Sequence, residues 1–327
     1  MSEMQLSSLA NSPHIRSLDI TRDLNAVADL IEMCFPIHKD RDGQTYLRQM
    51  RKTARDMQFV RWLSTMTELS GDRIAGFVWE EDSQILGNIS LVPFKENRRP
   101  IHMIANVAVR PEYRRQGIAR ALTVQAMDFL RRKHEKRIWL QVRSDDGGAQ
   151  ELYRSVGFVD RLKRTTWRVR PLDVRMPKDA RKEQIIVRKR RESDWAEQSA
   201  WLMTQYPPLM RWYLPVNFHH FETGPIQEVK NFLDGISLKH WVIERNGKCQ
   251  ATLSWQRTVT YANNLWLAMS PEADGELLTS GLPEIVRNFK RRHPLSLDIE
   301  YGDYVEELTA MGFKIYRTLI WMSRDLS

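Results

Sequence analysis

The sequence predicts an α/β protein built from two tandem copies of one fold, each a mixed α+β central sheet flanked by helices. Between Ile104 and Phe158 the pattern runs strand, basic turn, helix, strand, helix. A similar pattern returns in the second half of the 327 residues, and that length favours two domains. A proline-punctuated basic stretch without periodicity lies between the copies. We therefore predict domains at residues 1–170 and 185–327, joined by a linker at 171–184.

The first hundred residues predict the outer strands and helices of the first copy. Apolar residues recur at helical spacing between Asp23 and Cys34, and Pro36 ends that helix. Short alternating or apolar runs on either side of Glu81-Asp-Ser83 predict a hairpin. The expected elements are a strand at Ile15–Ile20, a helix at Asp23–Cys34, a charged helical region at Asp40–Leu63, and hairpin strands at Gly76–Glu80 and Ile85–Val92.

The central stretch opens with a strand at Ile104–Val109, which Pro111 closes because proline cannot donate to a ladder. A helix begins after Gly117 and runs to about Leu130, with one apolar stripe. Cationic residues follow at the negative end of its dipole. The remaining elements are a strand at Ile138–Val142, a helix ending in Leu152–Phe158 and a closing strand at Thr165–Val169.

The second half repeats this order of elements. Ser193 is a candidate N-cap for the first helix, and Asn246-Gly247 is a strong type I′ hairpin signal. We expect strands at Ile185–Arg188, His240–Arg245, Gln250–Thr258 and Leu295–Ile299, and helices from Ser193 to Met203 and from Pro283 to Arg291, with Pro283 in the first turn.

Short matching segments support an internal repeat of about half the chain. Leu267–Glu272 corresponds to Val107–Glu112, Gly312-Phe313 to Gly157-Phe158, and Trp321 to Trp167. The position that corresponds to Tyr153 is Leu308.

The turn before the central helix has the composition of an anion site. Gly117 lets the backbone approach a ligand closely, and the amides of Gln116 to Arg120 have no partner within the helix. Together with the helix dipole and the charges of Arg114, Arg115 and Arg120, they suit a diphosphate. The alternative is a surface helix with a basic edge.

Two motifs in this stretch resemble those of the GNAT superfamily of N-acetyltransferases. Arg114–Ala119 matches the family's Q/R-x-x-G-x-G/A signature after its fourth strand, and Leu152–Phe158 matches L-Y-x-x-x-G-F. The resemblance implies two tandem GNAT-like acyl-CoA N-acyltransferase domains, with acetyl-CoA as donor and CoA as product. It implies a cofactor site at Val107, Ala108, Val109, Arg114, Arg115, Gln116, Gly117, Ile118, Ala119, Arg120, Asp146 and Tyr153.

The resemblance also implies catalytic roles. The backbone amide of Val107 would stabilise the oxyanion, which in other acyl transfers is worth ~2.7–4 kcal/mol. The amides of Ala108 and Val109 would hold the pantetheine arm like an added strand. Tyr153 would protonate the leaving thiolate, although a packing tyrosine is the alternative. Asp146 replaces the asparagine of many members, so its contact with the arm is in doubt, and it can cap the helix instead.

The general base is not evident. Met103 lies where some members have a glutamate and cannot serve. His102 is a weak candidate, because alternation along the strand can turn it to the other face. The remaining options are Asn106, a poor base, the hairpin carboxylates Glu80 and Glu81, and deprotonation through water.

The second copy differs where chemistry would occur. Glu272, Asp274 and Glu276 occupy the region comparable to Arg114 and Arg115, and acidic side chains repel a diphosphate. We therefore predict one active half, the first, and one structural or substrate-shaping half. The tandem arrangement resembles bacterial two-domain members of the family such as mycothiol synthase.

Composition sets further expectations. The formal charge of +9 allows a nucleic acid, an anionic cofactor or a soluble arginine-rich surface, and arginine spread along the chain favours the last. No basic–aromatic platform indicates nucleic-acid binding. Cys34 and Cys249 lack metal-ligand spacing, and no apolar run spans a bilayer, so we expect no metal, no membrane and a cytoplasmic location. His219-His220 and the aromatic residues from Trp212 to Phe221 suggest core packing, or else an acceptor pocket.

The leading hypothesis is an acetyl-CoA-dependent N-acyltransferase for a small-molecule or peptide amine. The alternative is a non-catalytic acyl-CoA-binding sensor or interaction module, which the missing base motivates. The sequence specifies neither the acceptor, nor the acyl-chain length, nor the oligomeric state.

Overall fold

The chain folds into two compact units, Met1–Leu162 with Ile320–Ser327, and Lys163–Leu319. The computed structural model describes residues 12–55, 75–96, 99–177, 185–287, 289 and 293–326. Each unit has a mixed sheet flanked by helices, which confirms the predicted fold class. Within the described ranges, no helix is both long and apolar enough to cross a membrane.

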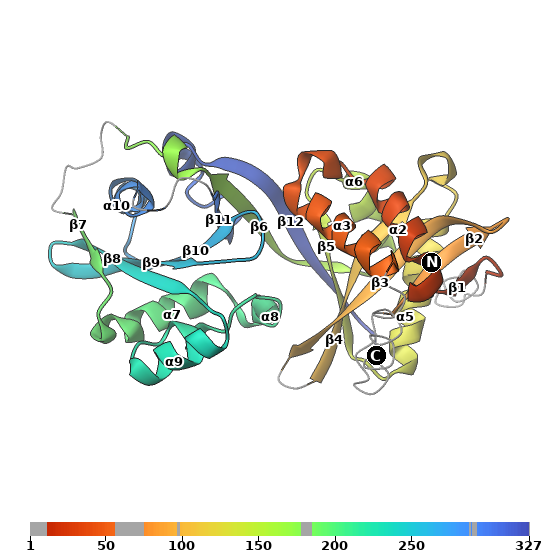
Figure 1. The fold of residues 1–327 in the computed structure, drawn as a ribbon, viewed down its shortest axis with the longest axis horizontal. Helices are drawn as coiled ribbons and strands as arrows, with labels where there is room; N and C mark the ends of the chain where they lie inside the picture. The colour runs from red at the N-terminus through yellow and green to blue at the C-terminus, as the bar shows by residue number, and fades with distance from the viewer. Residues whose placement is uncertain are drawn as a thin grey trace. The chain divides into compact units, whose positions relative to one another are not determined.

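The first unit arranges its strands in the order β1-β2-β3-β4-β5, followed by the end of β12 and the beginning of β6 (Figure 1). Pairing is antiparallel from β1 to β4 and parallel between β4 and β5. The elements are β1 (Ile15–Ser17), α2 (Ile20–Cys34), α3 (Arg41–Arg55), β2 (Ala75–Glu81), β3 (Gln84–Glu96), β4 (Arg99–Val109), α5 (Ile118–Arg132), β5 (Arg137–Arg143), α6 (Gly147–Ser155), β6 (Val159–Val169) and β12 (Lys314–Asp325). The part of the predicted charged helix beyond residue 55 lies outside the described residues.

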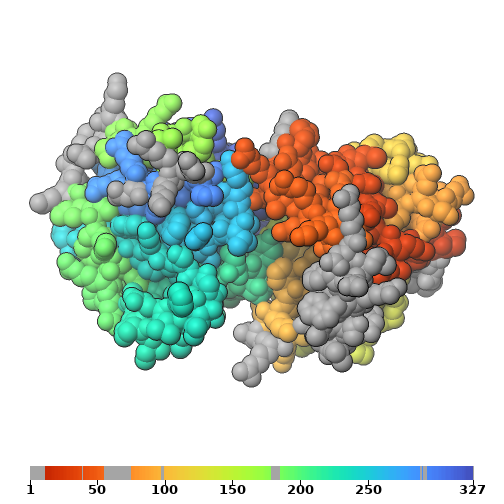
Figure 2. Space-filling view, in the orientation of Figure 1, coloured from red at the N-terminus to blue at the C-terminus, as the bar shows by residue number. Residues whose placement is uncertain are grey.

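Helices cover both faces of this sheet. Side chains alternate along a strand, and Phe77 packs in the cluster that contains Leu122 and Leu130 of α5. Its neighbour Val78 packs on the opposite face with Val27 and Ile31 of α2. In Figure 2 the red and orange-red atoms of α2 and α3 lie on the viewer's side of this unit.

The last residues of the chain complete the core of the first unit. Met322 and Leu326 are 0% and 2% exposed and belong to the cluster around α5. The Leu326 amide donates to the Lys136 carbonyl at 2.9 Å, and Arg131 donates to the Leu326 carbonyl at 3.2 Å. Figure 1 marks the C terminus beside α5. This division therefore differs from the predicted boundaries, which assign residues 320–327 to the second domain.

The second unit repeats the arrangement, with strand order β6-β11-β10-β9-β8-β7 and parallel pairing between β10 and β11. Its hairpin turns at Asn246 and Gly247, both at positive φ, as the sequence predicts. The elements are β7 (Ile185–Lys189), α7 (Trp195–Gln205), α8 (Pro208–Arg211), α9 (Pro225–Leu233), β8 (Leu238–Arg245), β9 (Lys248–Gln256), β10 (Asn263–Met269), α10 (Gly275–Arg287), β11 (Leu295–Glu300) and α11 (Val305–Ala310), with short 3₁₀ turns between some of them.

Two predicted helix starts in the second unit are wrong. The helix expected from Pro283 to Arg291 is α10, which begins at Gly275 and contains Pro283 in its interior. Burial of its apolar stripe compensates for the hydrogen bond that this proline removes. Ser193 is not an N-cap, because a 3₁₀ turn at Glu192–Asp194 precedes α7.

Candidate active site

A cleft of about 1230 Å³ opens in the first unit between the carboxyl-terminal parts of β4 and β5. The two strands pair only from His102 to Ile104 with Ile138 to Leu140 among the residues described. Beyond that point both strands continue as opposite walls of the cleft. The other walls are the end of α2, the amino-terminal turn of α5 and residues along the whole of α6. The separated strands leave backbone groups of β4 available to a ligand.

A bulge in β4 faces this cleft. Asn88 pairs with Ala108 and Ser90 with Ala105, so Asn106 and Val107 lie opposite a single residue of β3. Asn106 has φ of 52°, the left-handed conformation that asparagine tolerates better than most residues. Asn106 and Val107 both line the cleft.

The basic turn has the backbone geometry on which the predicted anion site depends. Arg115 and Gly117 have φ of 65° and 86°, and Gly117 is the N-cap of α5 without a capping side chain. The first amides of α5 therefore lack acceptors in the preceding turn. A Cβ built on Gly117 would meet no atom within 4 Å, so the glycine opens space on the cleft side. Arg114 is anchored through its Nε to the Val109 carbonyl at 3.2 Å.

Tyr153 reaches the cleft from α6 and is 7% exposed. Burial raises the pKa of its phenol above the ordinary value, and the charge of Asp146 raises it further. The hydroxyl therefore keeps its proton at neutral pH. Asp146 caps α6 by accepting from the Ala149 amide at 3.0 Å, which confirms its predicted capping role.

The cleft brings together most of the predicted site residues. Two of them are not in its lining: Gln116, which is exposed in the turn, and His102. His102 is 7% exposed, and its Nδ1 lies 2.6 Å from a carboxylate oxygen of Glu135. The lining residues among the predictions are Val107, Ala108, Val109, Arg114, Arg115, Gly117, Ile118, Ala119, Arg120, Asp146 and Tyr153.

Sequence reasoning missed several residues of this site. Cys34 and Pro36 line the cleft, and the Cys34 thiol donates to the Val109 carbonyl at 3.2 Å. The side-chain amide of Asn106 donates to the Tyr46 hydroxyl at 2.9 Å, and Asn88 contacts the same bulge from β3. The sequence singled out Pro36 only as a helix stop and Asn106 only as a poor base, because the contacts of α3 and β3 with the bulge are tertiary.

The second unit builds the corresponding region differently. Strands β9 and β10 pair residue for residue from Ala251 to Gln256 without a bulge. The carboxylate of Asp274 caps α10 by accepting from the Leu277 amide at 3.0 Å. The Glu307 side chain lies so close to Gly275 that a Cβ there would clash with it. Carboxylates thus occupy the helix start that the first unit leaves open.

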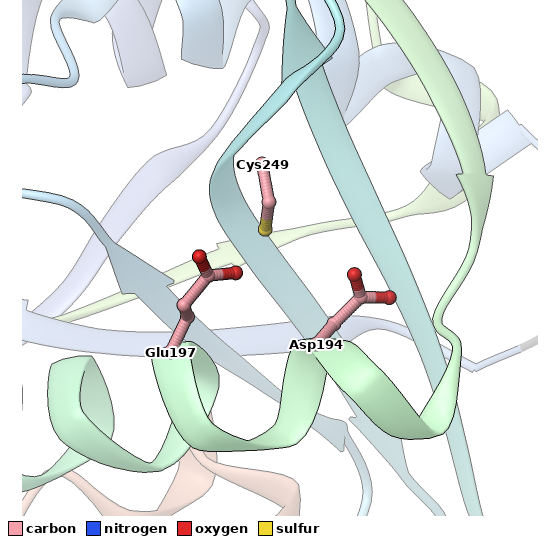
Figure 3. A group of neighbouring side chains, drawn as sticks. All are labelled: Asp194, Glu197 and Cys249. Atoms are coloured by element: carbon pink, nitrogen blue, oxygen red, sulfur yellow. The ribbon is translucent and has the colours of Figure 1, made fainter.

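A second cluster of polar side chains occurs in the second unit. The ligand atoms of Asp194, Glu197 and Cys249 lie within 4.8 Å of one another (Figure 3). Arg188 already binds both oxygens of Asp194, at 2.7 and 2.8 Å. Burial raises the pKa of the Cys249 thiol to about 12, with smaller contributions from Glu197 and Asp194, and metals bind the thiolate. We interpret the cluster as a structural ion pair of Arg188 and Asp194 beside a half-buried thiol.

The aromatic region of the second unit is largely core. Phe218 and Phe221 are 4% and 0% exposed, and their rings contact each other and Trp266. His219 and His220 have separate partners, Glu222 at 2.9 Å and Asn231 at 2.9 Å. The core-packing interpretation therefore holds for the two phenylalanines.

The sequence around this cleft matches a known family model. Residues 25–158 match the model of the acetyltransferase (GNAT) family. A [ribosomal protein bS18]-alanine N-acetyltransferase of Escherichia coli K12 is 43% identical over 53 residues, which are 16% of this chain and 36% of that protein. A mycothiol acetyltransferase of Kocuria rhizophila is 26% identical over 159 residues, 46% of this chain and 47% of that one. The chain therefore spans less than half the length of either curated relative.

Solved structures match over nearly the whole chain. A GCN5-related N-acetyltransferase from Sphaerobacter thermophilus superposes with a TM-score of 0.59 at 14% identity, covering 96% of each chain. A tandem GNAT protein from the clavulanic acid biosynthesis pathway gives a TM-score of 0.50 at 14% identity, covering 96% of this chain and 98% of that one. At these identities the matches show a shared fold. Residues 25–158, which contain the cleft of the first unit, thus match the acetyltransferase (GNAT) family model, and the chain shares its fold with tandem GNAT proteins.

Proposed function

We propose that the first unit is an acetyl-CoA-dependent N-acetyltransferase that acetylates an amine of a small molecule or peptide. The observation that carries this proposal is the convergence on one cleft of a bulged strand amide, an uncapped helix start and a buried, protonated tyrosine. The second unit, whose corresponding helix start is occupied by Asp274, has a structural or substrate-shaping role. Two free cysteines are compatible with a cytoplasmic location.

The residues present fit an acyl-CoA. The open amides of α5, with Arg114 and Arg115, suit its diphosphate, and the space beside Gly117 admits it. The backbone of Ala108 and Val109, separated from β5, suits the pantetheine arm as an added strand. When bound there, acetyl-CoA supplies the acetyl group as an activated thioester.

The residues of the chain then have distinct tasks. The Val107 amide donates toward the oxygen on which negative charge develops, a contribution of roughly 2.7–4 kcal/mol in other acyl transfers. Tyr153 holds the proton that the departing sulfur needs, and burial keeps that proton in place until then. The turn of Arg114 to Gly117 fixes the position of the donor relative to both groups.

The remaining task is to remove the proton of the amine. The carboxylates Asp145, Asp146 and Glu151 line the cleft, but Asp145 pairs with Arg143 at 2.7 Å and Asp146 caps α6. His102 lies outside the lining. We infer that water or the exposed Glu151 takes up this proton. The same observation favours the second candidate, an acyl-CoA-binding sensor without turnover.

The test is steady-state release of CoA from acetyl-CoA with a panel of amines. The panel contains small primary amines and peptides that begin with alanine, the latter chosen from the ribosomal-protein relative. Amine-dependent CoA release that the Tyr153→Phe variant loses supports the enzyme. Tight acetyl-CoA binding without turnover on the whole panel supports the sensor, and absence of binding contradicts both.

A further inference from the structure

A buried asparagine of β3 contacts the bulge from behind. Asn88 is 0% exposed, and its side-chain nitrogen donates to the Asn106 carbonyl at 2.8 Å. The same nitrogen lies 3.3 Å from the Ser90 hydroxyl. The bulge breaks the regular ladder between Asn88 and Ser90, so the side chain of Asn88 supplies a donor where the backbone register changes.

The geometry of one peptide group links this contact to the cleft. The carbonyl of Asn106 and the amide of Val107 belong to the same planar trans peptide, so they point in opposite directions. A donor that holds the carbonyl toward β3 therefore directs the Val107 N–H away from β3. Val107 lines the cleft on that side, where β4 has separated from β5. Donation to the carbonyl also polarises the peptide and strengthens its N–H as a donor.

We infer that Asn88 is a positioning residue of the reaction, which orients the Val107 amide through the Asn106 carbonyl. The inference rests on the proposed acetyl transfer. The side-chain oxygen of Asn88 is buried without a hydrogen-bond partner among the described residues. An unpaired buried oxygen is costly, so an apolar residue would serve the core better if Asn88 had only a packing role.

The second unit provides the matched comparison. Thr252 pairs with Ala268 in β10 as Asn88 pairs with Ala108 in β4, and Ala268 corresponds to Ala108 in the repeat. Thr252 is 0% exposed, and its hydroxyl has no partner in the described part of the chain. The equivalent strand pair has no bulge and leaves no peptide to orient. Thr252→Val is therefore the control for loss of a buried polar group at the same sheet position.

The experiment compares Asn88→Ala and Asn88→Leu with wild type and Thr252→Val in the full chain. Asn88→Leu keeps the number and branching of the side-chain heavy atoms, which guards against a cavity-induced folding failure of the alanine variant, and thermal unfolding checks each protein. We expect kcat to fall roughly tenfold to a hundredfold, less than the 10²–10³ that loss of a whole oxyanion donor costs. The KM for acetyl-CoA and its dissociation constant stay within about threefold, because the diphosphate site is untouched.

A second readout does not depend on turnover. The infrared carbonyl band of bound, ¹³C-labelled acetyl-CoA shifts to lower frequency when a donor polarises the carbonyl. We expect the wild-type shift to be reduced in both Asn88 variants and unchanged in Thr252→Val. Unaltered kcat and band position in a folded Asn88 variant would overturn the inference, as would equal losses in the control. If wild type binds no acetyl-CoA, the proposed function itself fails, which is a distinguishable result.

Discussion

Tyr153 and Leu308 occupy the same position in the two copies of the fold. The carbonyl of each accepts from the phenylalanine amide five residues later, at 3.0 Å from Phe158 and 2.9 Å from Phe313. The glycine before each phenylalanine has φ of 87° or 90°. The backbone motif is thus the same in both copies, while only the first places an ionisable hydroxyl there. This difference underlies the assignment of chemistry to the first unit.

Replacing that hydroxyl tests its role. We expect Tyr153→Phe to lower kcat by roughly 10²–10⁴, the usual contribution of a positioned acid, with little change in the KM for acetyl-CoA. Tyr206→Phe is the matched control, because burial also raises the pKa of Tyr206 but this residue lies in the second unit. Steady-state CoA release measures both. Wild-type kcat in Tyr153→Phe would show that the thiolate leaves without this proton.

The pH dependence of kcat tests the same residue independently. Burial, aided by the charge of Asp146, raises the pKa of Tyr153 above the ordinary value of 10.0. The acid form therefore persists as pH rises through 10, and its activity is lost only above that. We therefore expect no decline of kcat between pH 7 and about 10 that depends on Tyr153. With a saturating amine, any decline that wild type shows in this range is also present in Tyr153→Phe. An alkaline limb near pH 8 that depends on Tyr153 would refute the protonated-acid role.

Substitution of Gly117 tests its contact with the ligand, and a control glycine measures the effect of backbone strain alone. An alanine there meets no atom within 4 Å but must adopt φ of 86°, which costs about 1–2 kcal/mol. We expect Gly117→Ala to fold and to weaken acetyl-CoA binding at least tenfold, because its Cβ enters the space of the diphosphate. Gly247→Ala, with φ of 74° and similarly open surroundings in the β8–β9 turn, carries the same strain without a ligand. Calorimetric titration of both variants measures the difference. Equal affinities would contradict the anion site.

Truncation tests whether the first unit needs the end of β12. A chain that ends at Leu319 loses Ile320, Met322 and Leu326, which are 7%, 0% and 2% exposed in the core of the first unit. Large-to-small substitutions of such residues cost ~2–5 kcal/mol each, comparable in sum with the stability of a whole domain. We expect the truncated chain to lose the folded first unit and its acetyl-CoA binding, while Leu326→Ala retains both with a lower Tm. Binding by the truncated chain at wild-type affinity would show that the first unit is complete without β12.

Local signals in the sequence account for most of the fold. Strand alternation, the Asn246-Gly247 turn and the basic turn before Ile118 each depend on neighbouring residues, and each appears as predicted. The predicted helix start at Pro283 is wrong, because burial of a long apolar face outweighs the preference of proline for the first turn of a helix. The place of residues 320–327 in the first unit depends on pairing across the whole chain, which local patterns do not encode.

The candidate site likewise contains residues that local patterns predict and residues that they do not. The turn residues and Tyr153 carry motif signals, and the structure brings all of them except Gln116 to one cleft. The bulge at Asn106 has no such signal, since it arises from the register between β3 and β4. Asn88 and Tyr46 contact Asn106 from separate elements, so neither could be assigned from its neighbours in the sequence.

The most direct test of the account is a crystal structure of the full chain grown with CoA. We expect the diphosphate on the amides of Gly117 to Ala119, flanked by Arg114 and Arg115, with the sulfur between the Val107 amide and the Tyr153 hydroxyl. Diphosphate density at the start of α10 instead, or no bound CoA at saturating concentration, would contradict it.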